Sequence, residues 1–130
     1  MKSYNLNIIN NRKLPFLQYI DSGIKKAECR VCSPYIEKFK PGDILTLKGK
    51  GEYVKCSITY LHFYRNFEEM LNSEGVQNLV PFVDNFNDAL KIYNSFPGSE
   101  RVRTFGCCAI GVKCLESKLK FNITKSSKSI

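Results

Sequence analysis

The chain has 130 residues, 43% of them hydrophobic, and its 20 lysines and arginines against 12 acidic residues give a net charge of +8. This length and composition predict one domain with a single core and exclude wholesale disorder. No apolar run reaches the roughly 18 residues of a membrane span, and no hydrophobic leader follows Met1, so we expect a soluble, intracellular protein, cytoplasmic or nuclear, without a membrane partner.

The first third of the chain predicts two strands separated by a short helix. Residues 4–8 alternate apolar side chains with asparagines, which is typical of a strand. Pro15 fits the first turn of a helix, and Gly23 is suited to the left-handed conformation that ends it. From Ala27 onward a second strand is expected, with apolar and charged residues on opposite faces. The apolar face carries Ala27, Cys29 and Val31, and the charged face carries Lys26, Glu28 and Arg30.

The rest of the chain predicts three strands, two helices and a tail. Asn66 is a suitable N-cap for the first of these helices. The expected strands are 44–48, 53–62 and 105–115, and the expected helices are 66–74 and 85–95. After Glu116 the sequence is rich in lysine and serine, which predicts a domain over 1–116 and a flexible basic tail over 117–130.

Six cysteines in a chain of this length raise the question of a metal or disulfide framework. Cys29 and Cys32 have C-x-x-C spacing, but in a strand this spacing sends the two side chains to opposite faces. No second C-x-x-C follows, and there is one histidine, His62. We therefore expect reduced structural thiols, no metal site and no cofactor.

Four motifs in order resemble a known family. Residues 23–30 read G-x-K-x-x-E-x-R, and related motifs occupy 39–45, 66–71 and 105–112. Together they resemble the ASCH domain of the PUA-like superfamily over about residues 4 to 115. The resemblance implies an α+β fold: a curved, mostly antiparallel five-stranded sheet or small open β-barrel with two or three short helices. It also implies a ligand cleft beside the first motif.

The charged residues around this motif predict an anionic ligand. Arg30 can present a planar fork of donors to a phosphate or a base edge, and Lys25 a point charge. Glu28 can hold either cation or accept from an exocyclic amine, and nucleic acid is a frequent partner of basic domains. The aromatic candidates for base stacking are Tyr35, Phe63, Tyr64 and Phe96. The candidate ligand-binding set is Gly23, Lys25, Lys26, Glu28, Arg30, Tyr64, Arg101 and Arg103.

An enzymatic alternative also comes from the resemblance. Some small ASCH proteins are amidohydrolases that deacetylate 4-acetylcytidine, and their lysine falls on Lys25, but Glu28 stands where they place a threonine nucleophile. A carboxylate beside the lysine forms an ion pair and attacks an amide poorly. The region that holds their proton donor contains Glu68, Glu69 and Glu74, and the hydroxyls of Ser99 and Thr104 are substitutes for the nucleophile.

The leading interpretation is a small, monomeric domain that binds single-stranded RNA or a modified nucleotide. The alternative is an enzyme with Lys25 and Glu28 as catalytic residues, either an amidohydrolase of the 4-acetylcytidine type or a metal-independent ribonuclease. A third hypothesis is a protein-interaction adaptor, for which the sequence identifies no partner.

Overall fold

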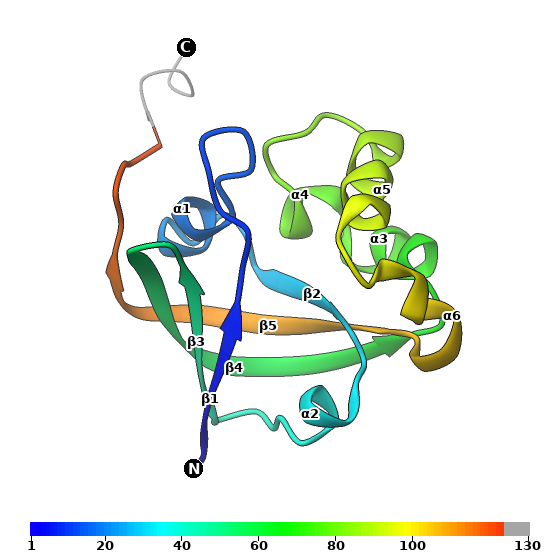
Figure 1. The fold of residues 1–130 in the computed structure, drawn as a ribbon, viewed down its shortest axis with the longest axis horizontal. Helices are drawn as coiled ribbons and strands as arrows, with labels where there is room; N and C mark the ends of the chain where they lie inside the picture. Colours follow the sequence, from blue (N-terminus) through cyan, green and yellow to red (C-terminus); the bar gives the residue numbers. More distant parts are fainter. Residues whose placement is uncertain (124–130) are drawn as a thin grey trace.

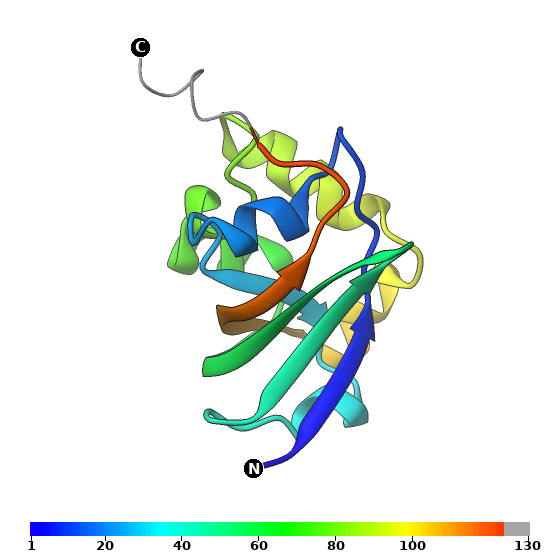
Figure 2. The same ribbon diagram turned by 90° about the vertical axis from the view of Figure 1, so that its left-hand side faces the viewer.

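The computed structural model describes residues 1–123. Its centre is one curled β-sheet (Figures 1 and 2). The strand order is β1-β3-β4-β5-β2, so that β1 and β2 are the two edges. β1 runs parallel to β3, and the other three pairings are antiparallel. The strands are β1 (Ser3–Asn7), β2 (Ala27–Val31), β3 (Ile44–Gly49), β4 (Glu52–Tyr64) and β5 (Cys107–Lys118). This architecture is the curved α+β half-barrel that the sequence predicted.

The long central pair β4 and β5 gives the sheet its curl. Their register shifts between Ile58 and Tyr60, as at a β-bulge, which increases local twist. At this point a Cβ on Gly111 would lie 2.3 Å from the Tyr60 ring, so only glycine fits. The curl brings the two sheet edges close enough for Arg30 of β2 to donate a hydrogen bond of 2.8 Å to the backbone oxygen of Asn7 at the end of β1.

Six α-helices and one 3-10 turn surround the sheet in the described residues. They are α1 (Phe16–Asp21), α2 (Pro34–Glu37), α3 (Phe67–Glu74), α4 (Val76–Leu79), α5 (Phe86–Ser95), η1 (Ser99–Arg101) and α6 (Val102–Phe105). The three expected helices are α1, α3 and α5, and Asn66 caps α3 by accepting from the backbone of Glu69 at 2.8 Å. The other three span four residues each, too few for a periodic pattern to reveal.

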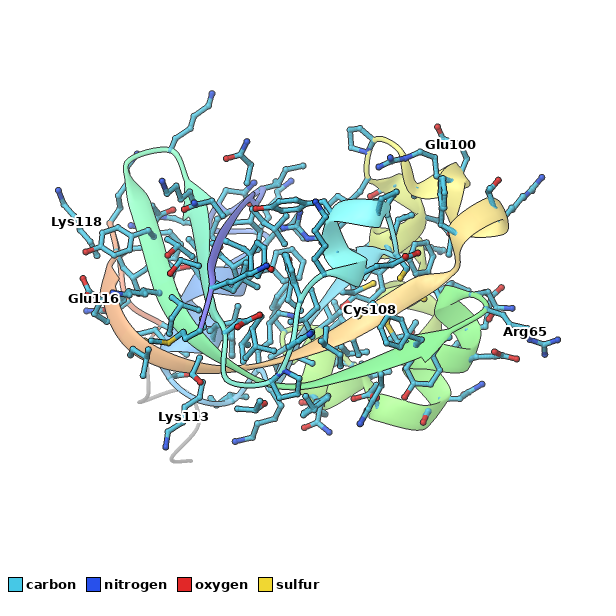
Figure 3. All side chains as sticks on the ribbon, turned by 90° about the horizontal axis from the view of Figure 1, so that it is seen from below. Arg65, Glu100, Cys108, Lys113, Glu116 and Lys118 are labelled. Atoms are coloured by element: carbon cyan, nitrogen blue, oxygen red, sulfur yellow. The ribbon has the colours of Figure 1, made fainter. Side chains whose placement is uncertain are left out.

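Two hydrophobic cores lie on opposite sides of β2. Ala27 and Cys29 belong to a core shared with α3 and α5, whereas Glu28 and Arg30 pair with Ile110 and Cys108, which belong to the core inside the curl. The alternation of the strand is therefore as predicted. Its charged face is not an open surface, however, because Glu28 is only 5% exposed. All six cysteines are free thiols, and five of them are buried, including Cys108 near the middle of the view in Figure 3.

The last strand extends further along the chain than expected. β5 continues to Lys118, two residues beyond the boundary expected at Glu116. The Ser117 hydroxyl donates to the carboxylate of Asp21 at 2.6 Å, which ties β5 to α1. The remainder of the expected tail, 124–130, lies outside the described residues. No helix within residues 1–123 is long and apolar enough to cross a membrane.

Candidate functional site

A cleft of about 330 Å³ opens at the seam between the sheet edges β1 and β2. Residues 6–9 form one wall, and residues 28–31 form the other. Phe16, Phe67 and Phe96 supply aromatic surface, and η1 lies at the rim with Arg101. The lining residues belong partly to β1, β2, α3 and α5, and Figure 1 shows how these elements are arranged. The cleft therefore exists because the half-barrel does not close.

Side chains from other elements form hydrogen bonds with backbone groups on the unpaired edge of β1. The Tyr35 hydroxyl accepts from the Asn5 N–H at 3.2 Å and lies 3.3 Å from the Asn5 carbonyl oxygen, to which it can instead donate. Arg30 donates to the Asn7 carbonyl. An unpaired edge would otherwise attract another strand. These contacts show that the odd-numbered residues of β1 direct their backbone polar groups toward the seam, where Asn7 and Ile9 line the cleft.

Glu28 places a fixed carboxylate in the cleft wall. Its Oε2 accepts from Arg30 Nε at 3.3 Å and from Arg30 Nη2 at 3.1 Å. Its Oε1 lies 3.4 Å from Nζ of Lys25. Two cations thus offset the cost of burying this charge. Each carboxylate oxygen has two lone-pair sites, so a capacity to accept from a bound molecule remains.

Lys25 lies behind Glu28 and does not line the cleft. Its side chain is 1% exposed, and Nζ donates to the backbone oxygens of Ala27 and Leu79 at 2.5 Å each. This differs from the expectation of a point charge offered to phosphate, because two buried carbonyls and Glu28 draw the ammonium inward. Burial lowers the pKa of Lys25, and the neighbouring Glu28 opposes that effect. Three acceptors around one nitrogen match the three N–H donors of a charged lysine.

Tyr93 also lines the cleft, and the sequence interpretation did not identify it as a candidate polar group of the site. It lies on α5, is 3% exposed, and its hydroxyl has no hydrogen-bond partner among the described residues. Burial raises the pKa of Tyr93 well above its ordinary value, and the nearby Cys29 and Glu28 add to this. The hydroxyl therefore stays protonated and can donate a hydrogen bond. An unpaired buried hydroxyl costs about 1 to 3 kcal/mol, which a bound acceptor would recover.

The other expected site residues divide between the cleft and the rest of the surface. Arg30, Arg101, Tyr35, Phe96 and Ser99 line the cleft. Outside it lie Gly23, Lys26, Phe63, Tyr64, Arg103, Thr104 and the candidate acids Glu68, Glu69 and Glu74. The Tyr64 hydroxyl donates to Glu74 on α3 and lies 3.1 Å from the Ser73 hydroxyl, from which it can accept. The pattern of the motif strand was enough to find Glu28 and Arg30, whereas only the folded chain brings Tyr93 to them.

Comparison with known proteins supports the fold. No family model matches the chain, and no curated protein matches it. The crystal structure of the hypothetical protein PH0355 is 27% identical with a TM-score of 0.76, and the match covers 87% of this chain and 99% of that one. The solution NMR structure of protein PF0455 from Pyrococcus furiosus is 28% identical with a TM-score of 0.67, covering 88% and 97%. Neither name states an activity, so these similarities support the half-barrel and leave the function to the site.

Proposed function

We propose that this protein is an ASCH-type, PUA-like domain that binds RNA or a modified nucleotide by holding one base in the cleft between β1 and β2. The observation that carries the proposal is that Glu28 and Tyr93 line one small cleft, and that the buried hydroxyl of Tyr93 has no hydrogen-bond partner within residues 1–123. The acceptor and the donor are both nearly buried, so water competes weakly for them.

The walls of the cleft suit a flat heterocycle. Phe96, which is partly exposed, offers aromatic surface against which a splayed base can pack, as single-stranded RNA recognition requires, whereas Phe16 and Phe67 line the cleft as almost fully buried core residues. A carboxylate accepts from an exocyclic amine or a ring N–H, and a tyrosine hydroxyl donates to a ring nitrogen or carbonyl. This combination suits cytosine, adenine and guanine, whose exocyclic amines each offer two N–H donors, better than uracil, whose base offers one ring N–H. Arg30 and Arg101 are the cleft residues available to a phosphate.

Binding suits the site better than hydrolysis does. Lys25, the expected base of an amidohydrolase, is fully engaged by Ala27, Leu79 and Glu28 and does not reach the cleft. Two guanidinium nitrogens of Arg30 donate to one carboxylate oxygen of Glu28, which lowers the reactivity of this carboxylate as a nucleophile. We therefore infer a recognition role for the Lys25, Glu28 and Arg30 cluster.

The first test is to titrate the wild-type protein and Tyr93→Phe with the four ribonucleosides by calorimetry. We expect tighter binding of the amine-bearing bases than of uridine, and a loss of about fivefold in Tyr93→Phe, since a hydrogen bond contributes about 1 kcal/mol. The unfolding midpoint should not fall, because the lost hydroxyl has no partner. Tyr53→Phe, whose hydroxyl contacts Glu116 outside the cleft, is the matched control. Equal affinity for all bases, or no effect of Tyr93→Phe, would refute the proposal.

The second test exchanges the acceptor for a group that also donates. Glu28→Gln places an amide where the carboxylate stood, and an amide N–H can pair with the O4 of uracil. We expect the preference to move from amine-bearing bases toward uridine. A general loss of stability would weaken binding of every base alike, so a change in the order of preference separates recognition from folding.

A further inference from the structure

A groove beside the cleft carries three cationic side chains. Arg12, Lys50 and Lys120 line it, and it shares the wall formed by Ile8 and Ile9 with the cleft. The three cations come from the loop after β1, the turn between β3 and β4, and the segment after β5. Among the salt bridges within residues 1–123, none involves these three side chains. Their positive charge is therefore available to a ligand.

Buried polar groups hold one wall of this groove in place. The Lys120 backbone N–H donates to Glu52 Oε1 at 3.1 Å. Gln18 donates to the same carboxylate at 3.2 Å and to the Phe121 carbonyl at 3.1 Å. Gln18 and Glu52 are both buried. The segment after β5 therefore lies alongside α1, as Figures 1 and 2 show. The hydrogen bond to Glu52 fixes the backbone of Lys120 within this segment.

The groove stays positive although it contains one acid. Glu52 also accepts from Asn10 at 2.9 Å, so its carboxylate is directed into the wall by three donors. Burial raises the pKa of Glu52, but these hydrogen bonds outweigh the effect and lower it. The Arg12 guanidinium lies 4.5 Å from the centre of the Phe121 ring, which orients this cation over an anchored aromatic side chain.

We propose that the ligand is a single-stranded polynucleotide whose phosphates lie in the groove of Arg12, Lys50 and Lys120, next to the base held in the cleft. This inference rests on the proposed function. The observation that supports it is that the two cavities adjoin. The cleft, which suits one base, and the groove, which suits phosphates, share the wall formed by Ile8 and Ile9. A chain leaving the cleft across this wall meets the three cations, whereas a free nucleoside does not.

The test compares ligands of different length on the full chain. The groove variant replaces Arg12, Lys50 and Lys120 with glutamine, and the control variant does the same to Lys40, Lys91 and Lys113, which are exposed and line neither cavity. Lys113 projects from the body of the protein in Figure 3. Affinities for cytidine and for single-stranded oligoribonucleotides of increasing length are measured between about 50 and 200 mM salt.

We expect the groove variant to bind cytidine as the wild type does and to bind the longer oligonucleotides at least tenfold more weakly at low salt. Its log-log salt slope should fall by about 2, since each phosphate contact contributes about 0.7 for single strands. If cytidine binds but both triple variants lose oligonucleotide affinity equally, the groove proposal is overturned while the base-binding proposal stands. If cytidine does not bind and Tyr93→Phe has no effect on oligonucleotides, the base-binding proposal fails, and this inference fails with it.

Discussion

Two buried carboxylates, Glu28 and Glu74, show how similar side chains serve different purposes in this protein. The Glu74 side chain accepts from the Tyr60 hydroxyl at 3.1 Å, from the Tyr64 hydroxyl, and from His62 Nδ1 at 2.8 Å. All three donors lie on β4, so Glu74 fastens α3 to that strand. It lines neither the cleft nor the groove.

Glu28 differs in what surrounds it. It is held by two cations and lines the cleft, and Tyr93, which lines the same cleft, has a buried hydroxyl with no partner among the residues that the structure describes. Buried polar groups in native proteins are almost always satisfied, so an unpaired hydroxyl beside a charged group and an open cavity calls for an explanation. The comparison teaches that both carboxylates stabilise the fold, and that only Glu28 lies in a cleft beside an unsatisfied hydroxyl, which is why we propose a binding role for Glu28 and none for Glu74.

The largest effect expected is on folding, from Glu28→Ala. Removing this carboxylate leaves the buried ammonium of Lys25 and the guanidinium of Arg30 without their acid, and breaking a buried pair costs about 3 to 5 kcal/mol. Urea unfolding measures the loss. The double variant Lys25→Met with Glu28→Leu removes both charges and should be more stable than Glu28→Ala. A small loss in Glu28→Ala would show that Lys25 finds water or another acid.

A smaller effect, on pH dependence, is expected from Glu74→Gln. Burial alone would raise the pKa of Glu74, but the hydrogen bonds from Tyr64, His62 and Tyr60 together lower it below its ordinary value of 4.5. A lowered folded-state pKa contributes stability above 4.5 that is lost as the pH falls through the folded-state value. Urea unfolding between neutral and acidic pH should therefore show a steeper loss in the wild type than in Glu74→Gln.

Base binding should be unaffected by this substitution at neutral pH. Cytidine titration of Glu74→Gln is the control, because Glu74 lies outside the cleft. A loss of affinity comparable to that of Tyr93→Phe would break the distinction between the two carboxylates. It would mean that the position of α3 affects the shape of the cleft more than its contacts indicate.

The smallest effect expected is in catalysis. The wild-type protein should not release cytidine from 4-acetylcytidine above the uncatalysed rate, because Lys25 has no access to the cleft and Glu28 is held by Arg30. Chromatography of the products measures this. Turnover by the wild type that Tyr93→Phe reduces would place a reaction in the cleft and favour the amidohydrolase interpretation over simple binding.

The sequence by itself determined the local structure and part of the site. The alternation over residues 27–31 predicted β2 and its two faces, and Asn66 predicted the start of α3. The order of strands and helices predicted a curved α+β sheet. These features depend on side-chain periodicity and capping, which act over a few residues and can therefore be recognised without tertiary contacts.

Only the tertiary structure decided how the site is assembled. The curl of β4 and β5 brings the edges β1 and β2 together, so that Arg30 reaches Asn7, and the packing of α5 brings Tyr93 into the cleft. Lys25 looked like a surface cation in the sequence, but the carbonyl of Leu79, 54 residues away, draws it inside. A buried charged side chain is stable only where it has compensating partners, and the positions of those partners depend on the tertiary fold.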